Sequence, residues 1–169
     1  MTQKTSVHIK PCNIGQSEAH NQRIKAYLDY INTEKFYIRK DLMSQNQSWT
    51  SDLQGAMTLQ QYYDTIGRLV KKKTGRAMQT KERERVNKKT GKIIKIAGCT
   101  PLREDVVVCK ADTTVEQLKH FAALCQQRFG ITAIQIHIHR DEGHCTDPSD
   151  ASTWKPNYHC SHYLELDEP

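Results

Sequence analysis

Histidine residues are concentrated near the C-terminal end of the chain, in segments that alternate apolar and polar residues. Five of the eight histidines are His137, His139, His144, His159 and His162. Alternation predicts strands, so His139 and His159 are expected on neighbouring strands with their imidazoles on one face of a sheet. Asp141 and Glu142 fall at the turn between these strands. Imidazoles and carboxylates brought together in this way can form a cage for a divalent metal ion.

Positive charge is concentrated in residues 71–95. The chain carries a formal net charge of +6, but residues 71–95 alone hold eleven Lys and Arg against two acids, which is +9. The remainder, with 14 basic and 17 acidic residues, is at −3. Localised charge favours a polyanionic partner, because neutralised phosphates release condensed counterions. A solvated basic hairpin or loop without a partner is the alternative. The expected phosphate contacts are Lys71, Lys72, Lys73, Arg76, Lys88, Lys89, Lys92 and Lys95.

The elements that must position these groups begin with a strand over residues 6–10, which Pro11 ends. A single helix is expected to start at a cap formed by Ser17 and to run to about residue 31. His20 would then lie in the first turn of that helix. Residues 44–48 have the composition of a loop.

The middle of the chain predicts a helix, a hairpin and a strand. Thr58 is expected to cap a helix that Gly75 ends. Residues 86–94 resemble a basic hairpin that carries most of the positive charge. Residues 102–109, which include Val106, Val107 and Val108, predict a central strand.

The last third predicts a helix and two strands. Thr113 or Thr114 would cap the helix and Gly130 would end it. A strand over 131–139 and another over 158–166, separated by a loop, would follow. On the first of these strands one face would hold Ile134, Ile136 and Ile138, and the other Gln135, His137 and His139. The pattern predicts an α+β fold with a mainly antiparallel central sheet flanked by helices, and with a basic hairpin insertion.

Length and composition restrict the class of protein. The 169 residues are about right for one domain spanning 1–169. No segment approaches the roughly 18 consecutive apolar residues of a membrane-spanning helix, and no signal peptide is visible, so a cytoplasmic protein with no membrane partner is expected. The six cysteines are scattered without a Cys-x-x-Cys pair and are expected to be reduced thiols.

Three short strings, which make up two motifs, resemble those of a known family. His139-Arg-Asp-Glu142, followed by Pro156-Asn-Tyr-His159, is similar to a His-x-Asp-Glu and Pro-His-x-His pair, and His20-Asn-Gln-Arg23 matches a His-Asn-x-Arg motif. These are motifs of the MobV (Pre/Mob) relaxases, mobilisation proteins of the HUH endonuclease superfamily. The order of elements is also similar over most of the chain, most of all to mobilisation proteins of Bacteroides-type elements.

The resemblance implies an HUH relaxase-like fold and an enzyme of plasmid or transposon mobilisation. Such a relaxase nicks one DNA strand at a transfer origin and keeps the 5′ phosphate covalently attached. In this resemblance His20 would attack the scissile phosphorus, Glu142 would orient a ligand or act as a base, and Arg23 would bind phosphate. A divalent cation, Mn²⁺ or Mg²⁺ in preference to Zn²⁺, would offset the charge on the phosphate. Its ligands would be His139, His159 and His162.

The chain departs from the family pattern at one ligand, because His159-Cys-Ser-His162 replaces His-x-His. Residues three apart on a regular strand face opposite ways. We therefore expect His139 and His159 to share the polar face, His162 to point away from it, and His137 to be the substitute ligand. One coding of residues 161–169, read one base later, restores His-Cys-His. The domain is thus expected to be incomplete at its C-terminus, with a sheet edge that permits a homodimer.

Several alternatives remain open from the residues. Tyr27 or Tyr30 could be the nucleophile in place of His20, as in tyrosine relaxases, although helical spacing favours a core position for Tyr27. The whole protein could be a non-catalytic DNA-binding remnant that uses only the basic segment. It could also be a zinc-stabilised interaction module, whose ligands would be His144, Cys145, His159 and Cys160.

Overall fold

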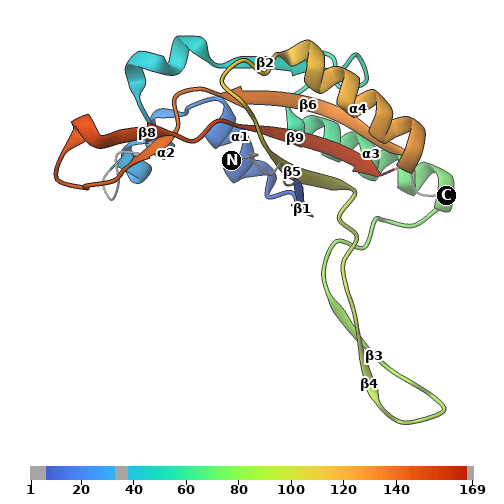
Figure 1. Ribbon diagram of the computed structural model, residues 1–169. Helices are drawn as coiled ribbons and strands as arrows, with labels where there is room; N and C mark the ends of the chain where they lie inside the picture. The colour runs from blue at the N-terminus through green and yellow to red at the C-terminus, as the bar shows by residue number, and fades with distance from the viewer. Residues whose placement is uncertain (1–6, 33–37, 167–169) are drawn as a thin grey trace.

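A five-stranded sheet organises the part of the chain that the structure, a computed structural model, describes: residues 7–32 and 38–166. Its strands are β1 (Val7–Pro11), β2 (Gln47–Thr50), β5 (Leu102–Val108), β6 (Ile131–His139) and β9 (His159–Leu166). Their order is β1-β5-β9-β6-β2, and every neighbouring pair is antiparallel (Figure 1). The predicted α+β class with a mainly antiparallel sheet is confirmed. The predicted central strand over 102–109 is also confirmed as β5, which lies inside the sheet between β1 and β9, and β9 is the middle strand of the order.

One face of the sheet is covered by helix α4 (Val115–Phe129). Thr114 and Gln117 form a capping box at its start, and Gly130 ends it in the left-handed conformation with a φ of 65°. Leu118 and Ala122 of α4 pack against apolar side chains of β5, β6 and β9. The sequence predicted this helix correctly because its caps and its apolar face are local features.

The opposite face of the sheet carries helix α3 (Leu59–Thr74), which has a capping box at Thr58 and a left-handed Gly75 at its end, as predicted. Leu59 and Tyr62 of α3 form a second apolar cluster with Leu102 on β5, Ile134 on β6 and Tyr163 on β9. The two faces of β9 therefore pack into two different apolar clusters. Polar side chains lie near one end of the strand.

A bulge in β6 corrects the predicted faces of that strand. The register with β9 shifts between Ala133 and Gln135, so Ile134 is the extra residue. Ile134 belongs to the cluster under α3, whereas Ile136 and Ile138 belong to the cluster under α4. The prediction of one face for all three isoleucines is wrong, because alternation restarts after a bulge.

The predicted helix from Ser17 to residue 31 is broken into two. Helix α1 (Ile14–Asn21) is capped by Asn13, and helix α2 (Lys25–Asn32) follows after a break at Arg23, whose φ is 52°. Such a φ is uncommon for a residue other than glycine and is incompatible with a continuous helix. His20 consequently lies in the last turn of α1 and not in the first turn of the predicted helix.

Helical periodicity alone does not show where this helix breaks. Ser17, the expected cap, is instead buried inside α1 and donates a hydrogen bond to Glu104 Oε2 at 3.1 Å.

The predicted basic hairpin is present as β3 (Arg83–Val86) and β4 (Ile93–Ile96). Figure 1 shows it projecting away from the five-stranded sheet. Gly91 adopts a φ of 66° in its turn. Residues 71–73, also part of the basic segment, belong to the last turn of α3 instead.

The remaining described elements are short. They are two 3-10 turns, η1 (Lys40–Gln45) and η2 (Ala151–Thr153), and a hairpin of β7 (Gly143–Cys145) and β8 (Trp154–Pro156). Residues 47–48, predicted as loop, belong to strand β2, because pairing with β6 gives that polar segment partners for its backbone. No described helix is both long enough and apolar enough to cross a membrane.

Candidate metal centre

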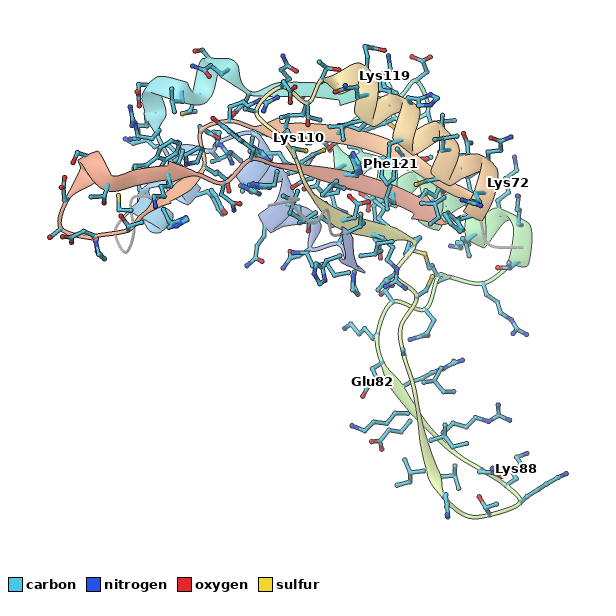
Figure 2. The ribbon with its side chains drawn as sticks, viewed as in Figure 1. Lys72, Glu82, Lys88, Lys110, Lys119 and Phe121 are labelled. Atoms are coloured by element: carbon cyan, nitrogen blue, oxygen red, sulfur yellow. The ribbon has the colours of Figure 1, made fainter. Side chains whose placement is uncertain are left out.

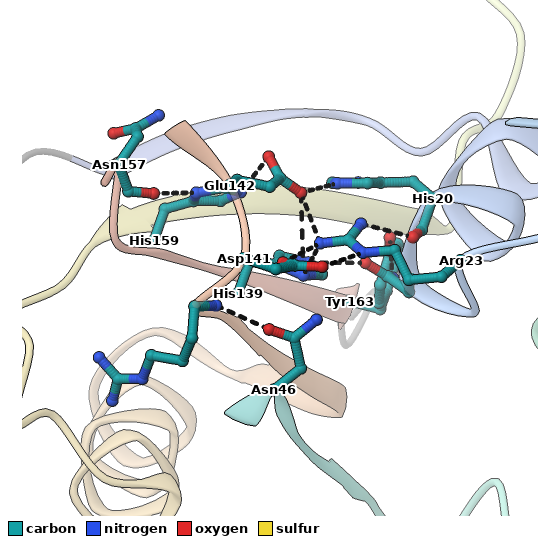
Figure 3. Close-up of polar contacts among 11 residues, drawn as sticks. His20, Arg23, Asn46, His139, Asp141, Glu142, Asn157, His159 and Tyr163 are labelled. Atoms are coloured by element: carbon teal, nitrogen blue, oxygen red, sulfur yellow. Dashed lines mark hydrogen bonds and ion pairs between the residues drawn. The ribbon is translucent and has the colours of Figure 1, made fainter. Parts of the chain in front are cut away.

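Four side chains from three separate parts of the chain converge at one end of the sheet (Figure 3). They are His20 of α1, His139 at the end of β6, Glu142 in the following turn and His159 at the start of β9. Their candidate ligand atoms all lie within 4.8 Å of one another. Imidazole nitrogens bound at about 2.1 Å to one ion are at most about 4.2 Å apart. A small contraction would therefore make this donor set fit a divalent cation.

His139 and His159 form the sheet part of this cluster, hereafter the His20 cluster. They are directly opposite each other on neighbouring strands, and their ring centroids are 5.0 Å apart. Both side chains are buried. The predicted placement of these two imidazoles on one sheet face is confirmed.

Glu142 connects the histidines. Its Oε1 accepts a hydrogen bond from His20 Nε2 and is 3.9 Å from His139 Nδ1, and its Oε2 is 3.4 Å from His159 Nε2. Burial alone would raise the pKa of Glu142, but the His20 hydrogen bond and the neighbouring imidazoles hold it well below its usual range. Glu142 is thus an ionised hydrogen-bond acceptor at neutral pH. It is better suited to orienting His20 or holding a cation than to removing a proton.

The tautomer of His159 follows from its second hydrogen bond. Its Nδ1 lies 2.9 Å from the backbone carbonyl oxygen of Asn157, which can only accept, so Nδ1 carries the proton. In the neutral ring the lone pair is then on Nε2, the nitrogen that faces Glu142. This is the arrangement in which a histidine can ligate a metal.

Arg23 lies in the break between α1 and α2, with 8% of its surface exposed. Its Nε and Nη2 donate to the two oxygens of Asp141 at 2.9 and 2.7 Å, and Nη2 also donates to Glu142 Oε1 at 2.7 Å. Nη1 donates to the carbonyl oxygen of His20 at 2.7 Å. The expectation that Arg23 is a phosphate contact is therefore corrected. These carboxylates engage the guanidinium inside the protein.

The same guanidinium sets the state of His139. Nη2 of Arg23 is 2.6 Å from His139 Nδ1, and His139 Nε2 is 3.1 Å from Asn21 Oδ1. A guanidinium only donates, so Nδ1 accepts and Nε2 donates to Asn21. Burial, together with the charge of Arg23, lowers the pKa of His139 to about 2. His139 is therefore neutral at physiological pH, as a metal ligand must be.

His162 does not join the His20 cluster, which corrects its expected role as a metal ligand. β9 stays in regular register with β6 from His159 to His162, so the two side chains face opposite ways. The ring of His162 lies 6.0 Å from that of Phe121 on α4, and its Nδ1 is 2.9 Å from Asp105 Oδ1. The prediction that His162 points away from the polar face is confirmed.

The third imidazole of the cluster comes from His20 and not from His137, the substitute predicted from the strand pattern. His137 lies one pleat from His139 and its Nε2 is 3.0 Å from Gln135 Oε1. The family resemblance placed His20 at this site as the nucleophile, but the strand pattern did not predict it among the potential ligands, because α1 is far away in the chain. The sequence analysis located Asp141 at the turn between the strands without giving it a role, and it assigned no role to Asn21. Both residues lie inside the motif strings.

The residues proposed for a zinc module do not converge. Cys160 is buried in the apolar cluster under α4, and burial raises the pKa of its thiol. His144 is exposed on β7. Among the described residues, the His20 cluster is the single group of three or more potential ligands.

A polar groove of about 460 Å³ adjoins His20. Lys10, Ser17, Tyr27 and Glu104 also line it. Tyr27, the alternative nucleophile, lies with its ring 5.4 Å from that of His20, and burial together with the charge of Glu142 raises its pKa. Ionising Tyr27 is therefore more difficult than in water. The side chain of Tyr30, the other alternative, lies outside the described part of the structure.

The basic residues are exposed and lie apart from the His20 cluster. In Figure 2, Lys88 is at the tip of the projecting hairpin, far from the sheet, whereas Lys72 is on α3. The exposed positive charge and the His20 cluster therefore lie in different parts of the molecule. The exposed residues of this set are Lys71, Lys72, Lys73, Arg76, Lys88, Lys89, Lys92 and Lys95.

When the chain was compared with family models, curated proteins and solved structures, none of them matched it.

Proposed function

We propose that this protein is a metal-dependent DNA-nicking transesterase of the relaxase type, which transfers a DNA 5′ phosphate to His20. The observation that carries the proposal is the convergence of His20 with His139, Glu142 and His159. A histidine beside a cation-binding set can perform covalent phosphoryl transfer, with the imidazole as nucleophile and the cation offsetting charge on the phosphate. The sequence motifs place the same four residues in a relaxase-like pattern.

His139, Glu142 and His159 would hold the divalent cation. Bound there, the cation would offset the negative charge that develops on the phosphate oxygens. Asp141 and Glu142 supply two negative charges against the single positive charge of Arg23, so the surroundings favour a further cation.

His20 is oriented for attack by its contact with Glu142. Because the ionised Glu142 can only accept, Nε2 of His20 carries the proton and the lone pair of the neutral ring is on Nδ1. Nδ1 would form the bond to phosphorus while the bond to the 3′ oxygen breaks. On balance the imidazole proton is lost and the 3′ oxygen gains one, which leaves a neutral 3′ hydroxyl and a phosphoramidate.

Two further features support DNA as the substrate. The groove beside His20 gives a phosphodiester access to the nucleophile. The β3–β4 hairpin presents exposed lysines that can bind phosphates at a distance from the reaction centre.

The test is to incubate the full chain with labelled single-stranded and supercoiled DNA and Mn²⁺, and to look for a covalent adduct on a denaturing gel. We expect an adduct that EDTA prevents and that acid cleaves, because phosphoramidates are acid-labile. The matched control is Tyr27→Phe, which should still form the adduct. An acid-stable adduct would move the nucleophile to a tyrosine, and nicking without any adduct would exclude transesterification.

A further inference from the structure

A second polar cavity, of about 280 Å³, lies between α1, β6 and the segment that joins β2 to α3. Four amide side chains contribute to its lining: Asn21, Gln22, Gln54 and Gln135. Glu18 lines it as well. Its size is close to the lower limit for small-molecule sites, so it suits a small planar group.

Gln54 is the residue that points to a ligand. It is 3% exposed, and its Nε2 donates to the carbonyl oxygen of Met57 at 2.6 Å. That bond fixes the orientation of the amide, because a flipped amide would put two oxygens together. Oε1 of Gln54 is buried without a hydrogen-bond partner among the described residues. A buried acceptor without a hydrogen-bond partner lowers the stability of the folded protein, and a hydrogen-bond donor on a ligand would remove this loss.

The cavity begins beside the His20 cluster. Asn21 follows His20 in the chain and lines the cavity, and its Oδ1 is 3.1 Å from Nε2 of His139. A nucleotide strand that placed one phosphate at the cluster could therefore place a neighbouring base in the cavity.

We propose that this cavity is a nucleobase pocket, which binds one unstacked base next to the nicked phosphate and prefers a base with an exocyclic amino group. The proposal rests on the DNA-nicking function above. Amide side chains read the edges of bases by hydrogen bonding, and unstacked bases are read on their Watson–Crick edges. Gln54 Oε1 and the Glu18 carboxylate are acceptors that suit the amino groups of adenine, cytosine or guanine. Thymine has no amino group, and its single N–H lies between two carbonyl oxygens. It can therefore donate less well to these two acceptors.

The first experiment measures binding without catalysis. The full chain is titrated with dAMP, dCMP, dGMP and dTMP in EDTA, and the side-chain amide signals of Gln54 and Gln135 are followed by NMR. We expect shifts with the three amino-bearing nucleotides and a Kd about fivefold weaker for dTMP, the usual effect of one hydrogen bond. No shift of these amides with any nucleotide, or equal affinity for all four, would overturn the proposal.

Variants locate the binding. Gln54→Met should abolish the discrimination against dTMP, and Gln60→Met on the exposed side of α3 is the matched control. If Gln54→Met does not fold, Ala56→Trp tests the same cavity, because Ala56 is exposed at its rim and a large ring there would close it. Unchanged nucleotide binding in Ala56→Trp would contradict the assignment.

The second experiment separates this proposal from the proposed function. Wild type and Gln54→Met are given a random pool of single-stranded DNA with Mn²⁺, and the sequences of the adducts are determined. We expect wild type to disfavour thymine at one fixed position near the nick, and the adducts that the variant forms to lack that preference. Adducts without any such position would overturn the pocket alone. Absence of adducts, with nucleotide binding intact in the NMR titration, would overturn the nicking function alone.

Discussion

Nη2 of Arg23 lies 2.6 Å from Nδ1 of His139, although the two residues are far apart in the chain. The guanidinium therefore donates to the ring nitrogen that also faces Glu142, at a distance of 3.9 Å. A cation held by His139 through Nδ1 would have to take the place of this hydrogen bond. The carboxylates of Asp141 and Glu142, both bonded to Arg23, decide how much positive charge this end of the sheet can accept.

The Arg23–Asp141 pair is expected to contribute strongly to stability. Asp141 is fully buried, and Asp141→Leu would leave the guanidinium with Glu142 as its remaining carboxylate partner. We expect the free energy of unfolding to fall by about 3 kcal/mol, because a buried charge loses its main partner. Urea denaturation measures this. The double variant Arg23→Met, Asp141→Leu should recover much of the loss, and strictly additive losses would contradict the pairing.

Metal affinity is expected to separate His159 from His162. His159→Ala removes a ligand of the His20 cluster and should weaken Mn²⁺ binding at least tenfold. The matched control is the double variant Asp105→Asn, His162→Gln, which alters the pair on the opposite face without leaving an unpaired charge. Its Mn²⁺ affinity should stay within twofold of wild type. Calorimetric titration of Mn²⁺ gives both values, and equal weakening in both proteins would refute the assignment.

His20 is expected to be needed for adduct formation and not for DNA binding. His20→Ala should abolish the covalent adduct, because the nucleophile acts after the DNA has docked, while the Kd for single-stranded DNA changes by no more than a few-fold. Gel analysis of adducts and fluorescence anisotropy give the two readouts. Undiminished adduct from His20→Ala would show that another side chain attacks the phosphate.

The lysines of the projecting hairpin are expected to bind phosphates. Replacing Lys88, Lys89, Lys92 and Lys95 by Gln should weaken DNA binding and lower the log–log salt slope by roughly 0.7–0.9 for each contact removed. The control is Lys110→Gln and Lys119→Gln, two lysines that Figure 2 places on the body of the protein. If the slope of the hairpin variant equals that of wild type, the hairpin charge is merely solvated.

Stability of the metal-free protein is expected to fall as the pH drops below about 6.5. Burial lowers the pKa of His137 to about 4 and that of His139 to about 2, whereas an unfolded histidine has a pKa of about 6.5. Above pH 6.5 both states are neutral, so these residues add no pH dependence. Below it the unfolded state takes up protons that the folded state does not, and the free energy of unfolding decreases.

The size of this effect can be assigned with one variant. Each of the two histidines should contribute a slope of up to about 1.4 kcal/mol per pH unit between pH 6 and pH 5. His137→Asn should lower the pH dependence of the free energy of unfolding by up to about 1.4 kcal/mol per pH unit, which corresponds to one proton. Urea denaturation in EDTA measures this. The same slope in the variant and in wild type would show that His137 is not buried as a neutral ring.

Local features of the sequence were enough to predict several elements. The capping residues Thr58 and Thr114 and the terminal Gly75 and Gly130 mark two helices correctly, because a helix end is determined by the few residues around it. Alternation likewise predicted that His139 and His159 share a face that His162 does not, since side chains on a regular strand have a period of two.

Tertiary structure alone decided the rest. Arg23, at the break between the helices, makes a buried ion pair with Asp141, and His20 contacts Glu142 in the cluster; both partners are more than a hundred residues away. Ile134 changes face because β6 must fit both β9 and α3. The periodicity of a sequence indicates only which residues close together in the chain lie on the same face of a helix or strand. Contacts between distant segments depend on how the elements pack, and at this end of the sheet they assemble the site.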